Sequence, residues 1–224
     1  MNSALIVGAG SGLSASLARL FVKHGLTVTL AARDTSKLAA LCGETGAIAI
    51  ATDATQPAEV ARLFDAIAAP DIVVYNASAR ARGPFTELDP PAVAQAIAVS
   101  AYGGFLVAQQ AVKRMLPRAA GAILFTGASA SVKGYAQSAP FAMGKFALRG
   151  LAQSMAREFS PQGIHIAHFV IDGGIRSATR QVPADKPDSL LDPDDIAETY
   201  WQVLNQKRSA WTWEVELRPW VERF

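Results

Sequence analysis

Short apolar runs alternate along the chain with longer segments in which apolar residues recur at helical spacing. The apolar runs cover 4–7, 27–31, 47–51, 72–75, 122–125 and 164–171. Strands buried on both faces of a parallel sheet have this continuous apolar character, and right-handed helical crossovers join them. The pattern predicts an α/β protein: a single-domain, doubly wound Rossmann fold with a parallel seven-stranded sheet and helices on both faces.

Helix start and stop signals mark the segments between these runs. Asp89 and Asp192 each precede a proline, as an N-cap residue does, and Gly25 is typical of the position just past a helix end. The spacing predicts helices over 12–24, 35–41, 57–68, 90–115, 138–159 and 193–204. A seventh strand is expected over 210–217, where alternation puts four large residues on one face: Trp211, Trp213, Val215 and Leu217.

Residues 1–224 are expected to form one domain, because no repeat, low-complexity segment or linker interrupts the pattern. The longest irregular segment, 173–192, follows the carboxyl end of a predicted strand, where ligands bind in such sheets. It is expected to be a substrate lid, with a mobile surface loop as the alternative. The C-terminal strand and tail, 208–224, are expected to serve packing or a subunit contact, or to close one side of the substrate cleft.

Composition narrows the class of protein. Half of the 224 residues are apolar, 18% are charged, and the net charge of +2 gives no basic surface for nucleic acid or an anionic membrane. We expect no membrane span, since no apolar stretch is as long as the roughly 18 residues that a bilayer requires, and no signal peptide. Cys42 is the one cysteine, which fits a reducing, cytoplasmic location. The histidines, His24, His165 and His168, are interpreted as structural, and no metal site is expected.

A glycine-rich turn follows the first apolar run and precedes a helix. The run ends in Gly8, Gly10 and Gly12. A strand that turns sharply into a helix leaves the amides of the first helical turn free for an anion, and glycine lets a phosphate approach the backbone closely. The segment 8–13 therefore predicts a site for a dinucleotide pyrophosphate, with a tight turn of no other purpose as the alternative.

Motifs in the same order along the whole chain resemble those of the short-chain dehydrogenase/reductase family. Gly8 and Gly12 match its glycine-rich turn, with Ser14 at the position of the third glycine, and Lys145 matches the lysine of its Tyr-x-x-x-Lys motif. The acidic residue after the third strand looks like Asp53, the turn after the fourth reads Tyr75-Asn76-Ala77-Ser78, and the turn after the sixth begins at Asp172-Gly173. The resemblance implies a cofactor site made by Gly8, Gly10, Ser11, Gly12, Leu13, Arg33, Asp53, Ala54, Asn76, Ala77, Lys145, Gly173 and Ile175.

The residue after the second strand bears on the choice of cofactor. An acidic residue there would repel a 2′-phosphate, but the sequence has Arg33, whose guanidinium can pair with a phosphate through two hydrogen bonds. NADP(H) is therefore favoured over NAD(H), with Ser11 as a possible second donor. Asp34 weakens the argument, and a solvated surface arginine is the alternative interpretation.

The residues that carry the chemistry in this family are altered here. The resemblance implies a tyrosine acid at the position of Phe141, whose phenyl ring has no proton to give. Ala128 stands where the family has a substrate-polarising serine, with Ser129 next to it, and Ser100 stands where the family has an asparagine. Lys145 is unchanged. General acid catalysis typically contributes about 10²–10⁴-fold, so standard carbonyl reduction should be slow.

Three explanations remain open at this point. A different group could replace the tyrosine: Tyr135, Tyr102, Ser129, Asp172, or a water relayed by Lys145. The substrate could need no strong acid, as in hydride addition to an activated carbon–carbon double bond or an imine. The protein could bind the nucleotide without turnover, as a sensor or scaffold subunit.

Partners follow from the resemblance and from one loop. A small-molecule substrate and a homodimer or homotetramer are implied, with subunits joined through two helices rich in small residues. The segment 173–192 carries Arg176, Arg180 and Lys186, which is a weak indication of an anionic substrate group.

Overall fold

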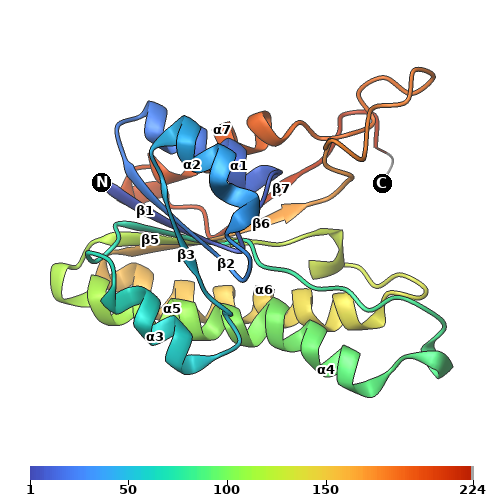
Figure 1. Cartoon of the computed structure of the whole chain (residues 1–224), viewed down its shortest axis with the longest axis horizontal. Helices are drawn as coiled ribbons and strands as arrows, with labels where there is room; N and C mark the ends of the chain where they lie inside the picture. The colour runs from blue at the N-terminus through green and yellow to red at the C-terminus, as the bar shows by residue number, and fades with distance from the viewer. Residues whose placement is uncertain (223–224) are drawn as a thin grey trace.

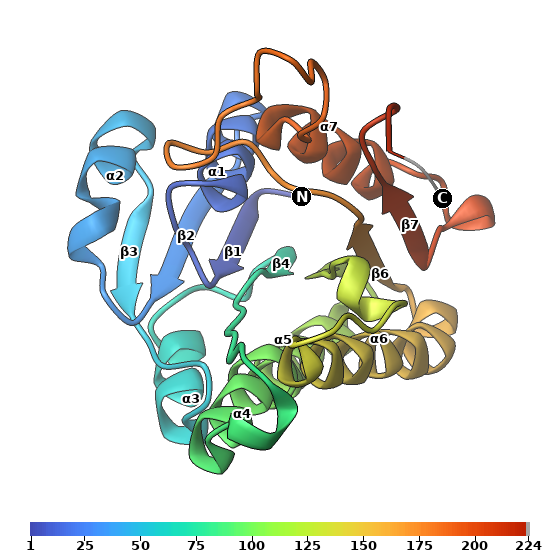
Figure 2. The ribbon, with the colours of Figure 1, turned by 90° about the vertical axis from the view of Figure 1, so that its right-hand side faces the viewer.

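The computed structural model describes residues 1–222, so the last two residues of the expected tail lie outside the described part. Seven strands form one parallel sheet in the order β3-β2-β1-β4-β5-β6-β7 (Figures 1 and 2). The strands are β1 (Ser3–Val7), β2 (Thr27–Ala32), β3 (Ile48–Ala51), β4 (Ile72–Tyr75), β5 (Gly121–Thr126), β6 (Ile164–Ile171) and β7 (Glu214–Leu217). This is the doubly wound topology that the alternating pattern predicts.

Helices cover both faces of the sheet (Figure 1). One layer holds α1 (Leu13–Lys23), α2 (Ala39–Thr45) and α7 (Pro193–Leu204); the other holds α3 (Pro57–Asp65), α4 (Pro90–Ile97), α5 (Gly103–Met115) and α6 (Ala139–Phe159). Short 3₁₀ turns lie at Ser36–Leu38, Phe85–Glu87, Leu116–Arg118, Ser129–Ser131, Ser160–Gln162 and Arg208–Ala210.

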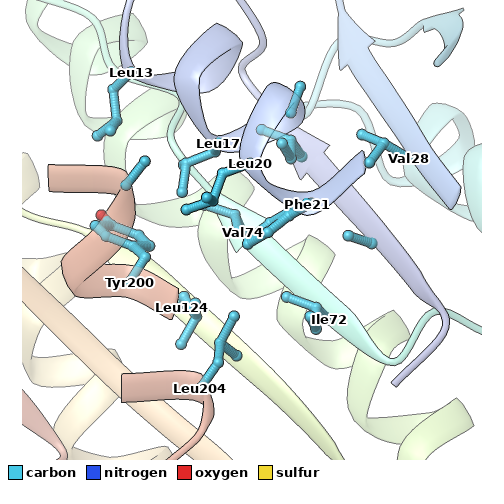
Figure 3. Packing of buried hydrophobic residues seen from close by; sticks show 14 of the residues in the cluster. Leu13, Leu17, Leu20, Phe21, Val28, Ile72, Val74, Leu124, Tyr200 and Leu204 are labelled. Atoms are coloured by element: carbon cyan, nitrogen blue, oxygen red, sulfur yellow. The ribbon is translucent and has the colours of Figure 1, made fainter. Parts of the chain in front are cut away.

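Each face of the sheet has its own apolar core. Under α1 and α7, Leu17, Phe21 and Tyr200 pack on Val74 and Leu124 of the central strands (Figure 3). The other core joins alternate residues of the same strands to α3, α5 and α6. Alternation of side chains along a strand explains why neighbouring residues of one run serve different cores.

The chain reverses its direction of winding between β1 and β4. β1 pairs with β2 on one side and with β4 on the other, with Val7 opposite Ala31 and Tyr75. The carboxyl ends of β1 and β4 therefore lie side by side, and the loops that follow them diverge. Ligands bind at such a switch point in doubly wound sheets.

The long helix expected over 90–115 is interrupted by a π-helical turn at Ala98–Tyr102. The hydroxyl of Tyr75, from β4, donates to the Val99 carbonyl at 2.5 Å, and a Cβ on Gly103 would lie 2.4 Å from that hydroxyl oxygen. A side chain that inserts into the helical ladder is a known cause of such turns. The apolar periodicity continues across the turn, so the sequence pattern gave no sign of it.

Two other elements differ from the sequence prediction. The segment 35–41 is a 3₁₀ turn followed by α2, which extends to Thr45 and ends at Gly46 in the left-handed region. The last strand begins at Glu214, not at 210. Before it, the Trp211 ring stacks on His165 and its indole N–H donates to the Gln206 carbonyl at 3.1 Å, so side-chain contacts hold this stretch outside the sheet.

The irregular segment 173–192 has no helix or strand, apart from isolated bridges at Ile175–Leu191 and Ser177–Arg180. It projects beside the end of β6, near the C-terminus (Figure 1). Contrary to the expectation that no apolar stretch is long enough to cross a membrane, Pro90–Arg118 is long and apolar enough by length and composition alone. Leu106, Val107 and Ala111 of that stretch pack in the core beside the sheet.

Candidate functional site

The three glycines after β1 differ in their surroundings. Gly8 has a φ of +82°, and a Cβ there would lie 2.3 Å from the Ala77 amide nitrogen, so the close contact between the β1 and β4 loops requires glycine. Gly10 and Gly12 would meet no atom within 4 Å. The fold thus needs Gly8, whereas Gly10 and Gly12 leave open space above the start of α1.

The N-terminus of α1 is suited to an anion. Gly12 is its N-cap residue, no side chain caps the helix, and its first turn contains no acidic residue. The amides of Ala15 and Ser16 donate to the Gly12 carbonyl, so the amides before them are the ones left for a ligand. The Leu13 side chain is buried in the core, and only its backbone can serve this site.

Ser14, which stands in place of the family's third glycine, joins the two loops at the switch point. Its hydroxyl donates to the Gly8 carbonyl at 3.2 Å and accepts from the Asn76 amide at 2.7 Å. This arrangement fixes the turn after β1 against the end of β4. Asn76 was expected in the cofactor site, but its contact with Ser14 has no local sequence signal.

A cavity of about 330 Å³ opens beside the glycine-rich turn, at the carboxyl ends of β1 to β4. Its lining residues include Gly8, Ala32, Arg33, Lys37, Asp53, Ala54, Asn76 and Ala77. The cavity therefore gathers six of the thirteen residues that the resemblance assigned to a cofactor. Ser11 lies on the exposed turn next to it.

Charges at this cavity favour a ligand with a phosphate. The acidic charge of Asp34 beside Arg33 counts against a phosphate at this place. Its carboxylate accepts hydrogen bonds from the Ser36 amide at 3.0 Å and from the Ser36 hydroxyl at 2.6 Å. These hydrogen bonds lower the pKa of Asp34. Arg33 has no ion pair with any residue in 1–222. Lys37, which has no local sequence signal for such a role, also lines the cavity, and its ammonium nitrogen lies 3.6 Å from the Asp34 carboxylate. Asp53 bonds the Thr55 amide at 2.9 Å, which fixes the loop after β3.

A second cleft, of about 340 Å³, opens over Phe141. Its lining includes Ser129, Tyr135, Gln137 and Gly173, together with Arg80 and Arg82 from the loop after β4. The guanidinium carbon of Arg80 lies 4.2 Å from the centroid of the Phe141 ring.

Lys145 lies beneath this cleft and is 2% exposed. Its ammonium nitrogen donates to the Thr126 carbonyl at 2.7 Å and lies 5.9 Å from the centroid of the Phe141 ring. Burial, and then the positive charge of Arg80, lower the pKa of Lys145 to about 7. The lysine is held within the protein and does not line the cleft.

The other predicted catalytic residues are dispersed. Ser129 hydrogen-bonds to Asp172, whose pKa it lowers, and Lys133 donates to the same carboxylate at 2.9 Å. Ser100 is fully buried, and its hydroxyl accepts from the Ala79 amide at 3.4 Å. Ser129 therefore borders the cleft, whereas Ser100 supports the loop that carries Arg80.

Of the residues considered as replacements for the missing tyrosine, some line the cleft and others lie away from it. Tyr135 lines the cleft, but Tyr102 is exposed and stacks on Phe105 of α5. Gly173 borders the cleft, whereas Ile175 packs against the core. The structure thus brings Ser129 and Tyr135 together and places Tyr102 elsewhere.

His168 has a partner that sequence reasoning did not see. Its Nδ1 lies 3.1 Å from Glu214 of β7, which also pairs with Arg149, and burial lowers the pKa of His168 to about 4. It is a structural histidine. No cluster of metal-ligating residues occurs within residues 1–222.

Arg80 and Arg82 are the main residues that sequence reasoning missed. Both follow Asn76 at the carboxyl end of a predicted strand, which is the signal that could have found them. Their convergence with a helix much further along the chain is a tertiary contact that no local pattern shows.

Comparison with known proteins defines the class. Residues 2–186 match the family model for short chain dehydrogenase, and the chain belongs to that family of Rossmann-fold oxidoreductases. Members of the family bind NAD(P)(H). A solved short-chain dehydrogenase from Rhodopseudomonas palustris is 34% identical, with a TM-score of 0.84 over 98% of this chain and 100% of that one.

Two curated relatives show how far the similarity extends. An uncharacterized oxidoreductase from Staphylococcus aureus is 26% identical over 96% of both chains. Short chain aldehyde dehydrogenase 1 from Euphorbia lathyris is 30% identical over 73% of this chain, and the match spans 60% of the plant protein.

Proposed function

We propose that this protein is an NADP(H)-dependent oxidoreductase that transfers hydride to or from a small molecule whose reaction does not depend on the family's tyrosine acid. One observation carries the proposal: the nucleotide cavity is open and equipped for phosphate, while Phe141 occupies the position of the acid beside it. Both cavities open at the carboxyl edge of the same sheet.

The residues present fit the dinucleotide. Gly10 and Gly12 leave a space that a Cβ would fill, and the uncapped start of α1 suits a pyrophosphate. Arg33 and Lys37 are placed for a 2′-phosphate, and Asp53 with Ala54 borders the place for adenine. Asn76, Ala77 and Gly173 would hold the nicotinamide end, with Lys145 and Ile175 behind them. The bound cofactor would supply the hydride.

The chain's own residues would bind, orient and shield the substrate. Phe141 offers an apolar floor to the cleft. Ser129 and Tyr135 offer hydroxyl groups at the edge of the cleft. An iminium carbon accepts hydride without a proton, and an activated double bond can take its proton at carbon afterwards from solvent, so such substrates suit this cleft better than a simple ketone does.

A second function has one specific observation in its favour. Lys145 is buried and bonded to a backbone carbonyl, so both residues of the family's Tyr-x-x-x-Lys pair are withdrawn from acid catalysis. A protein that binds the nucleotide without turnover, as a sensor or a scaffold subunit, would show the same arrangement.

A single-turnover assay separates the two functions. The protein is mixed with NADPH and, in parallel, with a cyclic enone, a cyclic imine and a ketone of similar size, and the nicotinamide absorbance is followed. Oxidation of NADPH by the enone or imine, faster than by the ketone, supports the enzyme. Binding of NADPH with no oxidation by any acceptor supports the sensor, and a Gly12→Asp variant serves as the control without a nucleotide site.

The expected homodimer or homotetramer remains a proposal. Exposed aromatic and methionine side chains on the π turn and on helices α5 and α6 support it, namely Tyr102, Phe105, Met143 and Phe146. Sedimentation of the purified protein tests it, and a monomer at micromolar concentration would contradict it. A cytoplasmic location and a substrate lid at 173–192 also remain predictions.

A further inference from the structure

Two arginines line the cleft over Phe141, and the charge of a third acts on one of them. Arg80 and Arg82 come from the loop after β4 and line the cleft. Arg180 comes from the segment 173–192, where its guanidinium lies 3.2 Å from the place that a Cβ on Gly174 would occupy. It does not line the cleft, but it lies close enough for its charge to lower the pKa of Arg80.

Arg80 shows that these charges act on one another. Its guanidinium carbon lies 4.2 Å above the centre of the Phe141 ring, a stacked arrangement that favours a cation. Loss of hydration there, and then the charges of Arg82 and Arg180, lower the pKa of Arg80. Like charges that repel across a cleft are stabilised when an anion binds between them.

The lining of the cleft contains no carboxylate that could pair with these arginines. Other cations nearby are paired: Lys133 with Asp172, Arg176 with Asp192, and Arg218 with Glu216. Within residues 1–222, by contrast, Arg80, Arg82 and Arg180 form no ion pair. The chain pairs its structural cations and leaves these three available.

We infer that the cleft over Phe141 is an anion subsite, in which Arg80, Arg82 and Arg180 hold the carboxylate or phosphate of the substrate. The inference rests on the proposed function, since it assigns the substrate class of the same site. The planar guanidinium forks suit both oxyanion groups through paired hydrogen bonds. An anion held there would lie beside the ring of Phe141 and would fix the rest of the substrate against the nucleotide cavity.

Calorimetry on the protein saturated with NADP⁺ tests the inference without any turnover. The probes are 4-oxopentanoate, its uncharged methyl ester, and hydroxyacetone phosphate. At least one anion should bind about 10-fold or more tightly than the ester, because hydrogen bonds to charged groups are worth that much, and its affinity should fall with added salt. The tighter of the two anions identifies carboxylate or phosphate as the natural group.

Arginine variants locate the effect. Arg80→Gln, Arg82→Gln and Arg180→Gln should each weaken the favoured anion by about 10-fold and leave the ester unchanged. Arg157→Gln is the matched control, because Arg157 is an exposed arginine at the far cavity beside Trp213. Equal binding of ester and anions, or full anion affinity in all three cleft variants, would overturn the inference.

The failure of the inference is distinguishable from the failure of the proposed function. Titration with NADP⁺ alone reports on the nucleotide cavity. Normal NADP⁺ binding without anion preference overturns the anion subsite only. The anion and ester titrations are therefore repeated without nucleotide. If the protein does not bind NADP⁺ but still prefers the anions, and the cleft variants lose this preference, the subsite is supported and the oxidoreductase is contradicted.

Discussion

The two cavities at the carboxyl edge of the sheet differ in what they require of the sequence. The nucleotide cavity is built from backbone: a glycine-rich turn, a helix start and the ends of four strands. The cleft beside it depends on a few side chains, and there Phe141, 7% exposed under Arg80, occupies the position that we propose for the family's acid. A site made of backbone depends on the fold alone. A cleft lined by side chains can gain or lose a catalytic group by one substitution that leaves the packing unchanged.

The largest expected effect comes from returning the acid to the cleft. Phe141→Tyr combined with Ala128→Ser should speed NADPH-dependent reduction of an activated ketone by about 10²–10⁴-fold, the usual contribution of a general acid. Single-turnover rates measure it. Phe146→Tyr, an exposed position on the same helix, is the control and should change nothing. An unchanged rate in the double variant, with NADPH still bound, would show that the missing acid is not what limits the reaction.

Blocking the nucleotide cavity should have the next largest effect. Gly12→Asp places a carboxylate where the pyrophosphate is expected, and repulsion should weaken NADPH binding by about 100-fold or more. Thermal unfolding should be unchanged or slightly raised, because aspartate is a good N-cap residue for α1. Full NADPH affinity in this variant would place the pyrophosphate elsewhere.

Gly8→Ala is the contrasting change at the same turn. Its Cβ would lie 2.3 Å from the Ala77 nitrogen at a φ of +82°. The variant should lose about 2 kcal/mol or more of unfolding free energy, from overpacking and backbone strain. Urea denaturation measures it, and wild-type stability would show that the two loops can move apart freely.

Arg33 tests the choice between the two cofactors. Arg33→Ala should weaken NADPH by about 10-fold, through loss of a charged contact to the 2′-phosphate, and leave NADH unchanged. Arg62→Ala, which removes an exposed arginine paired with Glu59 outside the cavity, is the control. Equal weakening of both nucleotides would mean that Arg33 contacts a group they share.

The smallest effect concerns the pH dependence of stability. Burial and the charge of Arg80 hold the pKa of Lys145 at about 7, so between about pH 7 and 10 the unfolded chain binds a proton that the folded protein lacks. Unfolding free energy should therefore rise from pH 7 to pH 9 by about 2 kcal/mol more in the wild type than in Lys145→Met. Urea midpoints at the two pH values measure it.

The exposed Lys113→Met variant is the control for that slope and should behave as the wild type does. If Lys145→Met had the same slope as the wild type, the ammonium of Lys145 would have to keep its proton throughout this range.

The sequence predicted the backbone of the molecule far better than its side-chain contacts. Six strands lie within a residue of the predicted runs, since buried parallel strands are continuously apolar. The π turn escaped because the Tyr75 hydroxyl that accompanies it comes from another element. The early start given to β7 came from alternating tryptophans, whose rings pack against His165 and Arg149 instead.

The same distinction holds for the candidate site. The residues assigned to the nucleotide cavity were found because glycine and strand ends have local signals. Ser14 bonded to Asn76, and Arg80 stacked on Phe141, could not be found in this way, since each joins segments that only the folded sheet brings together.

Equilibrium titration of the wild-type protein with NADPH and with NADH, followed by tryptophan fluorescence or calorimetry, decides whether the cavity beside the glycine-rich turn binds a nicotinamide cofactor. We expect micromolar binding of NADPH and markedly weaker binding of NADH, because the backbone site, Arg33 and Lys37 are intact. If neither nucleotide bound at millimolar concentration, the fold would have been kept without its cofactor, and the oxidoreductase proposal would be wrong.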